Sequence, residues 1–345
     1  MRVLIVKRDK LGDLLLTTPV FAQLKAARPE VEIHLLANDY NAWVVRDDPA
    51  LARIWVYPRV RHDGHVRPAA VLAQLRLAWK LRCAAFDWAI AMGGEESPRA
   101  VRRALATGAR RVVAYVRDPA RYGRGLTDSL PTPSTGHELV RMMSLLAPLG
   151  IEPTGPAPVP AYRWPADGTT FARRWLAERG LVRGRYLVLG IGARFACRQP
   201  SFEQILSWTA RFRVRWSLPT VFLWTPGNAD AARYRGDDEI AARVLARRLP
   251  HLHPYRGPVP EALALIANAA ASIMPDSGLM HFAAASPGGV VGLFADPDAI
   301  GGADRWGPVG ARAHYLQARN AVAEIPDEAV LAALDPLIAN APAFI

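Results

Sequence analysis

The start of the chain has the order strand, polar loop, helix. Residues 3–6, Val-Leu-Ile-Val, are aliphatic and too few for a helix, so they predict a buried strand. Residues 7–13 are mostly charged and contain a glycine, which indicates a loop. Hydrophobic residues then recur at helical spacing over residues 14–24, and this helix begins either after Thr18 or as early as Asp13. In open α/β sheets ligands bind at the carboxyl ends of the strands, so Asp13 lies where chemistry is usually done.

Strand and helix alternate along the rest of the chain. Most of the predicted strands are short apolar runs that end near Gly, Pro, Asn or Asp, and a helical pattern follows most of them. The strands are predicted at residues 31–36, 54–57, 86–92, 111–115, 186–189, 220–224, 271–274 and 289–294. This alternation favours parallel, doubly wound sheets, and the two halves of the chain look like two copies of one architecture.

A proline-rich stretch at residues 153–165 predicts a stiff linker between two domains. We therefore expect one domain at residues 1–160, a second at 161–326, and a terminal helix within 327–345. The length of 345 residues suits two domains, and a content of 51% hydrophobic and 21% charged residues is that of an ordinary globular protein.

The composition also limits where the chain is expected to work. It lacks an uninterrupted apolar run of the roughly 18 residues that a membrane span needs. Its strand-like start predicts that there is no signal peptide. With only Cys83 and Cys197, a disulfide framework is not expected, and a reducing cytosol is the default.

The chain is strongly basic, with 43 Lys and Arg against 31 Asp and Glu, a net charge of +12 and a pI of about 10.3. This surplus suggests anionic partners: nucleic acid, anionic lipid or phosphorylated substrates. Zinc-finger spacing and a long basic tail are both missing and aromatic residues make up only 8%, so we do not expect nucleic-acid recognition. One basic set is either a solvated face or a site for a phosphorylated lipid: Arg59, Arg61, His62, His65, Arg67, Arg76, Lys80 and Arg82.

Asp13 is the first candidate for catalysis. It lies in a loop with Lys7, Arg8 and Lys10, and we expect these cations to hold it ionised. An ionised carboxylate in such a loop can accept a proton from a hydroxyl nucleophile. On spacing alone, an Asp that caps the first helix is the simpler interpretation.

The second half holds three candidate loops. Residues 276–281, Asp-Ser-Gly-Leu-Met-His, follow a strand and open a helix, so they predict either an anion site or a plain helix cap. Residues 190–194, Gly-Ile-Gly-Ala-Arg, form an incomplete dinucleotide fingerprint but suit a loop that approaches a phosphate. Asn228 ends another strand and either holds ribose hydroxyls or belongs to a simple turn.

No motif in the sequence indicates a metal or a cofactor. There is no Ser/His/Asp elbow, HExxH motif or Cys/His metal set, so we expect neither a cofactor nor a metal site. Residues 296–298, Asp-Pro-Asp, resemble the Asp-x-Asp of metal-dependent glycosyltransferases. We discount them because the surrounding chain lacks the organisation of that one-domain fold.

The run KRDKLGDLLLTTPVFAQLKAARPE, residues 7–30, resembles the opening of the lipopolysaccharide-core heptosyltransferases, glycosyltransferase family 9. The resemblance implies a GT-B fold, in which two Rossmann-like domains face each other across a cleft and the C-terminal helix packs back on the first domain. It implies that Asp13 is the catalytic base. It also places a donor site in the second domain, formed by Asp276, Ser277, Gly278, His281, Gly192, Arg194, Arg198 and Asn228.

The chain departs from the family at one donor loop. The family usually has Lys-x-Trp-Pro there, with the Lys on the donor phosphate, whereas this chain has Cys197-Arg198-Gln199-Pro200. We expect Arg198 or Arg194 to supply the missing charge. Because Arg is bulkier and forked, the exchange is not neutral, and it bears on the identity of the donor.

The expected reaction is an inverting, metal-independent glycosyl transfer. The resemblance implies heptose from ADP-heptose as the transferred sugar and a lipopolysaccharide core as the acceptor, with Lys7, Lys10, Arg61 and Arg67 near the acceptor or the phosphates. The expected partners are a nucleotide sugar and an anionic glycolipid at the cytoplasmic face of the inner membrane. Two alternatives stay open: another nucleotide sugar used for a different surface polysaccharide, or a non-catalytic binding module at a membrane surface.

Overall fold

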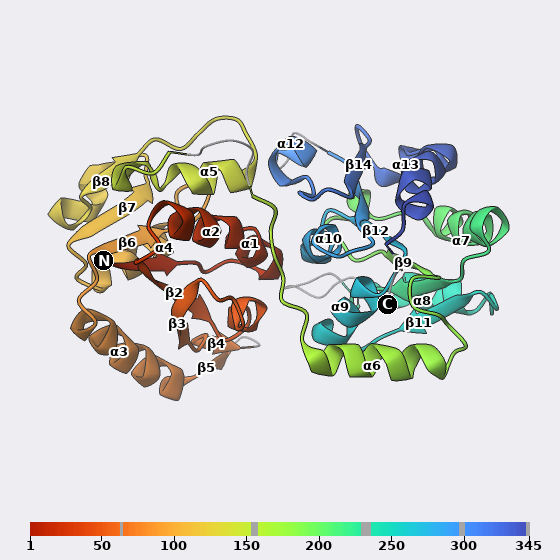
Figure 1. Ribbon diagram of the computed structural model, residues 1–345, viewed down its shortest axis with the longest axis horizontal. Coiled ribbons are helices and arrows are strands. Elements are labelled where there is room, and N and C mark those ends of the chain that lie inside the picture. The colour runs from red at the N-terminus through yellow and green to blue at the C-terminus, as the bar shows by residue number, and fades with distance from the viewer. Residues whose placement is uncertain (63–64, 153–157, 229–235, 297–300, 343–345) are drawn as a thin grey trace. The chain divides into compact units, whose positions relative to one another are not determined.

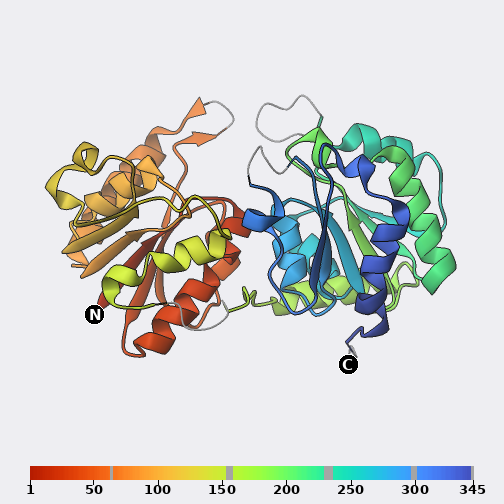
Figure 2. The same ribbon diagram turned by 90° about the horizontal axis from the view of Figure 1, so that it is seen from above.

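The chain folds into two compact units, Met1–Arg163 and Trp164–Ile345. The computed structural model describes residues 1–62, 65–152, 158–228, 236–296 and 301–342. Each unit is built around a six-stranded parallel sheet with helices on both of its faces, as Figures 1 and 2 show.

The first unit has a six-stranded sheet with the order β3-β2-β1-β6-β7-β8, and every neighbouring pair is parallel. Its strands are β1 (Arg2–Val6), β2 (Glu32–Asn38), β3 (Leu51–Tyr57), β6 (Trp88–Ala91), β7 (Arg111–Tyr115) and β8 (Asp128–Leu130). Its helices are α1 (Leu11–Leu15), α2 (Thr18–Ala27), η1 (Ala42–Val45), α3 (Pro68–Cys83), α4 (Pro98–Ala106), η2 (Pro119–Gly125), α5 (Glu138–Ser144) and η3 (Ala147–Leu149). A short antiparallel hairpin, β4 (Arg61–His62) and β5 (His65–Val66), precedes α3.

Burial explains why β1 forms the centre of this sheet. Val3, Leu4, Ile5 and Val6 are all fully buried, because a central parallel strand is covered by helices on both faces. Leu4 and Val6 belong to a core cluster that also contains Leu81 of α3 and three residues of α4. The predicted strand at the start of the chain is confirmed.

The second unit has the same architecture, with the order β11-β10-β9-β12-β13-β14 and parallel pairing throughout. Its strands are β9 (Leu187–Gly190), β10 (Thr220–Leu223), β11 (Leu252–Tyr255), β12 (Ala271–Pro275), β13 (Val290–Phe294) and β14 (Ala313–Gln317). Its helices are α6 (Ala166–Ala177), η4 (Ala196–Arg198), α7 (Phe202–Trp216), α8 (Asp238–Leu245), α9 (Val259–Ala267), α10 (Gly278–Ala284), α12 (Gly302–Trp306), η5 (Val322–Glu324) and α13 (Asp327–Ala339). The predicted capping box at the start of α7 is present: Gln204 N–H donates to Ser201 Oγ at 3.1 Å, and Ser201 N–H donates to Gln204 Oε1 at 3.0 Å.

The strand order reverses at the same point in each sheet. The chain builds outward from β1 through β2 to β3, then returns to place β6 on the other side of β1. In the second unit β12 returns to the free side of β9 in the same way. The loops that leave β1 and β6, and those that leave β9 and β12, therefore flank the crevices in which doubly wound sheets bind ligands.

The terminal helix packs within the second unit. We expected it to pack on the first domain, but Val330, Leu331, Leu334 and Leu337 of α13 belong to the core of the second unit. There α13 lies against α7, β12, β13 and β14. Its four apolar residues recur at helical spacing, so they form one stripe on the helix. This stripe packs against the sheet beside α7.

Over the part of the chain that the structure describes, none of the helices is both long and apolar enough to cross a bilayer.

Candidate active site

Two buried asparagines form hydrogen bonds to the backbone of the loop that leaves β1. Asn38 Nδ2 donates to the carbonyl oxygen of Arg8 at 2.9 Å, and Asn41 Nδ2 donates to that of Asp9 at 2.8 Å. Asn38 is the last residue of β2, the strand beside β1, and Asn41 lies three residues later. The loop is therefore fixed at the carboxyl edge of the sheet before α1 begins.

Asp13 lies in the first turn of α1, where its Oδ2 accepts a hydrogen bond from the Lys10 N–H at 3.0 Å. Burial raises the pKa of Asp13, and the nearby carboxylates Asp9 and Glu138 raise it further, while Lys7 and the Lys10 hydrogen bond act in the opposite direction. We expected the cations to dominate. Lys7 and the Lys10 hydrogen bond do lower the pKa of Asp13, but burial outweighs them, and the sequence shows charged neighbours but not the loss of solvent around the carboxylate.

Lys7 is buried beside this carboxylate and is not a surface cation. Its Nζ lies 3.0 Å from Asp9 Oδ2 and 3.4 Å from the sulfur of Met142. Burial alone would lower the pKa of Lys7, but attraction to Asp9, Asp13 and Glu138 outweighs burial and raises it. The ammonium therefore stays charged and balances several carboxylates in one place.

Glu138, the first residue of α5, is a member of this cluster that the sequence did not single out. It is buried, and its Oε1 accepts a hydrogen bond from the Gly94 N–H at 2.7 Å. A Cβ at Gly94 would lie 2.2 Å from Glu138 Oε2, so only glycine allows this approach. An acid that opens a helix normally indicates a favourable helix-dipole charge, and the sequence gives no sign that this one is buried against the loop after β6.

Two further cations lie near each other in the first unit. Arg8 Nε is buried and has no hydrogen-bond partner among the described residues. The Arg103 guanidinium lies 3.9 Å from the ring centre of Tyr57 and donates to Gln74 Oε1 at 3.0 Å. Burial lowers the pKa of Arg103, and the charge of Arg8 also lowers it. Two like charges held this close attract an anion.

The other predicted cations of the first unit are not buried with Lys7. Lys10 and Arg67 are exposed, and Arg67 stands at the N-cap of α3. Arg61 is in β4, but its side chain lies outside the described part of the structure. The structure therefore brings Lys7 to Asp13 and leaves Lys10 and Arg67 at the surface.

In the second unit, Arg198 and Asp276 join the loops that leave β9 and β12. The Arg198 side chain is 2% exposed, and its Nη1 forms an ion pair with Asp276 Oδ2. Arg198 Nε and Nη2 are buried and have no hydrogen-bond partner within the described ranges. A buried guanidinium with two uncommitted donors is suited to a charged oxygen ligand.

Gln199 links the same loop to the strand on the other side of β9. Its Nε2 donates to Asp237 and, at 3.3 Å, to the carbonyl oxygen of Ile191. Asp237 in turn accepts a hydrogen bond from the Thr225 N–H at 3.0 Å, after β10. A Cβ at Gly192 would lie 2.3 Å from Thr225 Oγ1, which explains the glycine at this position. The loops after β9, β10 and β12 thus form one structured edge, and the sequence did not indicate the roles of Gln199 and Asp237.

The remaining predicted donor residues lie around this edge. Ser277 is the N-cap of α10 but makes no side-chain capping bond, Gly278 is exposed, and His281 is buried within the same helix. Arg194 is exposed, with its guanidinium 5.3 Å from the ring centre of Phe195. Asn228 is exposed, and its carbonyl oxygen accepts a hydrogen bond from the Gly236 N–H at 2.9 Å.

Among the residues described here, no group of three or more His, Cys, Asp or Glu is placed to hold a metal ion. Of the Asp-Pro-Asp stretch that we discounted, Pro297 and Asp298 lie outside the described residues.

Comparison with known proteins supports the resemblance seen in the sequence. Residues 239–329 match the sequence model of glycosyltransferase family 9 (heptosyltransferase). No match was found among curated proteins.

Solved structures share the fold over nearly the whole chain. A family 9 glycosyltransferase from Veillonella parvula has a TM-score of 0.77 at 18% identity, covering 98% of this chain and 97% of its own. The E. coli ADP-heptose lipopolysaccharide heptosyltransferase II has a TM-score of 0.74 at 18% identity, covering 98% and 99%. The E. coli heptosyltransferase WaaC with ADP has a TM-score of 0.71 at 18% identity, covering 98% and 100%.

These likenesses confirm the predicted GT-B class of fold, with its two α/β units. Taken with the family match in the second unit, they show that the chain is similar to the heptosyltransferases of glycosyltransferase family 9.

Proposed function

We propose that this protein catalyses an inverting, metal-independent transfer of a sugar from a nucleotide sugar to a hydroxyl group of a lipopolysaccharide core or a related surface glycan. The best candidate donor is ADP-heptose, because two of the similar structures are E. coli heptosyltransferases, one of them with ADP bound. The observation that carries the proposal is the environment of Asp13, a carboxylate at the edge of a doubly wound sheet whose pKa is raised by burial.

Asp13 acts as the general base. A carboxylate with a raised pKa is a stronger base than one in water, so it takes a proton more readily from an alcohol. As Asp13 takes that proton, the acceptor oxygen bonds to the anomeric carbon from the side opposite the diphosphate. The bond from that carbon to the diphosphate oxygen breaks, its electron pair stays on the nucleoside diphosphate, and the anomeric configuration inverts.

Lys7 and Glu138 are positioning residues in this scheme. Lys7 places one buried positive charge among Asp9, Asp13 and Glu138, which keeps Asp13 available as an anion in spite of its burial. Glu138 is itself fixed by the Gly94 N–H at 2.7 Å. Neither residue has to touch the substrate for the step to proceed.

Arg198 stabilises the leaving group. Its Nε and Nη2 donors are uncommitted among the described residues, and its ion pair with Asp276 fixes the orientation of the guanidinium. Fixed donors aimed at a developing negative charge are a major source of rate enhancement. In this scheme Arg198 takes the place of the lysine that the family usually has at the position of Cys197.

The acceptor is proposed to be anionic and to bind on the first unit. Arg8 lies in the loop that leaves β1 and its charge lowers the pKa of Arg103 in α4, and an acceptor phosphate or carboxylate would relieve the repulsion between these two cations. Lys10, Arg61 and Arg67 are further candidates for this contact. The acceptor class therefore follows from charge, while the position of the acceptor hydroxyl follows from Asp13.

The test of this reaction is Asp13→Asn, which keeps an oxygen that can accept the Lys10 hydrogen bond. We expect turnover with ADP-heptose to fall by about 10²- to 10⁴-fold, the usual contribution of a positioned base. Binding of ADP should change by less than about twofold, the scatter of surface substitutions. Asp39→Asn is the matched control, since Asp39 is paired with Arg59 at 2.7 Å and lies outside the cluster. Wild-type turnover in the Asp13 variant would show that the base has been assigned wrongly.

A second donor class is favoured by one specific arrangement. Gln199 and Asp237 occupy the edge where the family usually has a Trp, and they present polar groups there. A different nucleobase or sugar would suit these groups. Turnover assayed with a panel of ADP-, UDP-, GDP- and dTDP-sugars separates the two candidates, because only the donor and not the role of Asp13 differs between them.

A further inference from the structure

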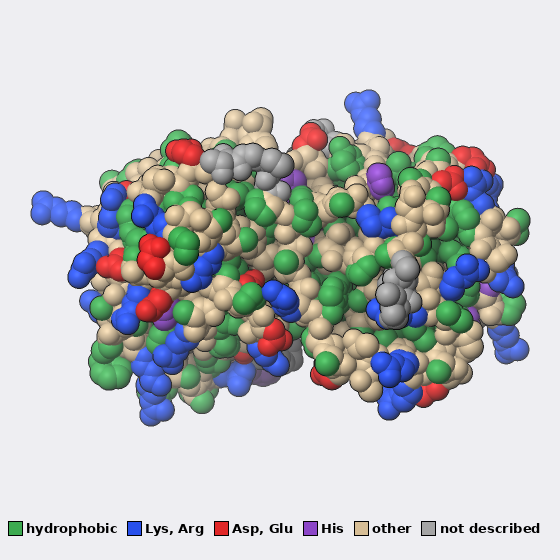
Figure 3. Space-filling model, viewed as in Figure 1, with side chains coloured by type: hydrophobic (Ala, Val, Ile, Leu, Met, Phe, Trp, Pro, Cys, Tyr) green, Lys and Arg blue, Asp and Glu red, His purple; other side chains and the backbone are tan. Residues whose placement is uncertain are grey.

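Helix α3 of the first unit displays an apolar stripe to solvent. Val71, Leu72, Leu75 and Trp79 are 40%, 50%, 64% and 67% exposed, and they recur at helical spacing along one side of the helix. In Figure 3 hydrophobic side chains lie next to Lys and Arg side chains over α3, at the lower left of the face shown. Four large apolar residues in contact with water on one helix form a patch that calls for an explanation.

Packing within the first unit does not require this stripe. The opposite side of α3 anchors the helix, with Ala70 and Leu81 buried and Leu77 packed against the core cluster. Gln74 on that side donates to the carbonyl oxygen of Pro58 at 2.6 Å. The inner side alone therefore fixes α3 to β3 and its neighbours, and the outer stripe is free to serve another purpose.

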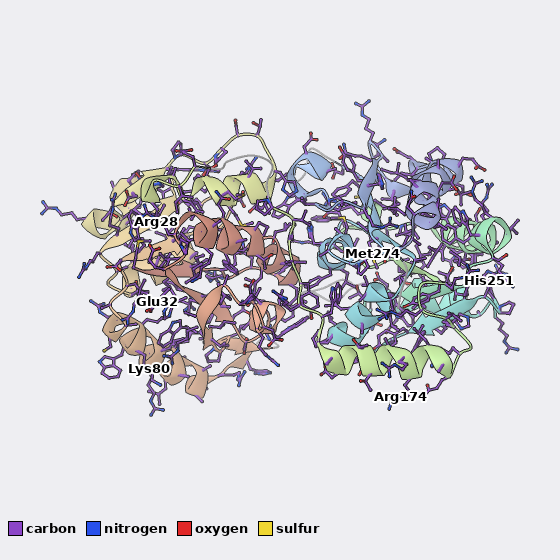
Figure 4. The ribbon with its side chains drawn as sticks, viewed as in Figure 1. Arg28, Glu32, Lys80, Arg174, His251 and Met274 are labelled. Carbon is purple, nitrogen blue, oxygen red and sulfur yellow. The ribbon has the colours of Figure 1, made fainter. Side chains whose placement is uncertain are left out.

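Cations flank the stripe along its length. Arg67 stands at the N-cap, and Arg76, Lys80 and Arg82 are exposed on the helix itself, which contains no Asp or Glu. None of these four forms an ion pair with any residue that the structure describes. Lys80, labelled in Figure 4, lies on α3 at the outer edge of the first unit. The positive charge is therefore available to an external anion.

A second copy of the chain is a poor occupant for this surface. A two-fold symmetric contact would bring the stripe against itself, and the same cations would then face one another. The net charge of +12 adds long-range repulsion between copies. A surface that offers both apolar side chains and anionic groups fits the observed pattern better.

We propose that α3 is a docking helix that lies in the surface of an anionic lipid bilayer. Val71, Leu72, Leu75 and Trp79 enter the boundary between the headgroups and the acyl chains, while Arg76, Lys80 and Arg82 contact lipid phosphates. This combination, an apolar stripe with an aromatic residue between cationic flanks, is the pattern of interfacial helices. The inference is independent of the proposed reaction, since it concerns a surface and not the site of transfer.

The test is binding of the full chain to vesicles without donor or acceptor, measured by co-sedimentation. We expect binding to phosphatidylcholine vesicles that contain about one-third phosphatidylglycerol, weak binding to pure phosphatidylcholine, and release as salt screens the charges. The variant Leu75→Gln/Trp79→Gln should bind about tenfold more weakly, because it removes buried apolar area. Arg76→Gln/Lys80→Gln should weaken binding by about fivefold for each charge removed.

Matched controls separate α3 from the rest of the surface. Val214→Gln removes an apolar side chain on α7 that is 86% exposed, and Arg99→Gln/Arg102→Gln removes two exposed charges on α4. Both controls should bind vesicles like the wild type.

A second measurement reports where α3 lies. An environment-sensitive dye on Cys83, at the end of α3, in a Cys197→Ser background should shift its emission to the blue on anionic vesicles only. Equal binding of the Leu75/Trp79 variant and the wild type, or an unshifted dye, would overturn the proposal. A dimer in solution that the same variant dissociates would also overturn it, in favour of a protein interface.

Discussion

At the scale of single residues, Asp13 is held in an environment that disfavours its charge. Because burial raises its pKa, the ionised carboxylate is less stable in the folded protein than in the unfolded chain. The folded state therefore holds its proton over a pH range where the unfolded chain has released it. Over that range, from the ordinary value of 3.8 up through the raised pKa, the contribution of Asp13 to stability falls as pH rises.

This predicts that Asp13→Asn stabilises the protein at neutral pH while it lowers turnover. The gain should be about 0.5–2 kcal/mol, the usual range for one stabilising substitution. It should shrink toward pH 4, where the unfolded wild type begins to take up the proton that the folded state already holds. Urea unfolding between pH 4 and pH 8 measures the difference, with Asp39→Asn as the control. A variant that is less stable than the wild type at every pH would contradict the direction assigned to the Asp13 pKa.

Arg198 and Arg194 can be separated by substitution. Arg198 is buried beside Asp276 with two uncommitted donors among the described residues, whereas Arg194 is exposed over Phe195. Arg198→Met should weaken ADP binding by about 10- to 100-fold, the range expected for one or two hydrogen bonds to a charged group. Arg198→Lys should be intermediate, because it keeps the charge but loses the fork. It also keeps a partner for Asp276, so it tests binding even if the Met variant folds poorly.

Arg194→Met is the matched control for that prediction. It removes the same side chain four residues away and should leave the Kd for ADP, measured by calorimetry, within about twofold. If Arg194→Met weakened ADP binding as much as Arg198→Met, the charge would be supplied by the exposed residue.

At the scale of elements, the strands of the two six-stranded sheets that the sequence missed are all edge strands. The central strands β1, β9 and β12 are buried on both faces and consist mainly of apolar residues. Their local sequence pattern was therefore sufficient to predict them as strands. The missed strands β8, β11 and β14 each have only one neighbour and carry exposed or half-buried residues. Pro254 in β11 and the short length of β8 weaken the pattern further. These segments become strands because they pair with a neighbouring strand, and a local sequence pattern does not encode that pairing.

Helix α13 gives a prediction at the same scale. Leu334 is fully buried in the core of the second unit, so Leu334→Ala should destabilise that unit by about 2–5 kcal/mol. Ala332, on the exposed side, is the control, and Ala332→Ser should change stability by less than about 0.5 kcal/mol. Hydrogen exchange followed by peptide should show lost protection in β9, β12 and β13 and none in β1 or β2. Lost protection in β1 would mean that α13 supports the first unit after all.

At the scale of the whole molecule, the two units repeat one design with different chemistry at corresponding edges. Beside β1, a buried Lys7 balances several carboxylates, and beside β9 a buried Arg198 keeps two donors uncommitted within the described part of the chain. The sequence located both edges, since each follows an apolar strand. It could not show Glu138 beside Lys7 or Asp237 beside Gln199, because those partners are far apart along the chain and only the fold brings them together.

This division predicts that a nucleoside diphosphate stabilises the second unit selectively. A ligand that binds only the folded state raises the free energy of unfolding by about 2.7 kcal/mol at 100 times its Kd. Each unit has its own core, so calorimetry of the full chain should show the stabilisation in the transition of the second unit. We expect ADP to act with EDTA present and UDP and GDP to act weakly, and we expect Arg198→Lys to reduce the shift.

Each possible result with ADP, UDP and GDP bears on a different part of the proposed reaction. A shift with ADP alone supports an ADP-sugar donor, and a shift with another base keeps Asp13 as the base but moves the reaction to another donor. A shift with none of them would overturn the donor site built on Arg198, because its uncommitted donors would then have no diphosphate to bind. Vesicle binding through α3 would stand in every case, since it is carried by exposed residues of the first unit and requires no nucleotide.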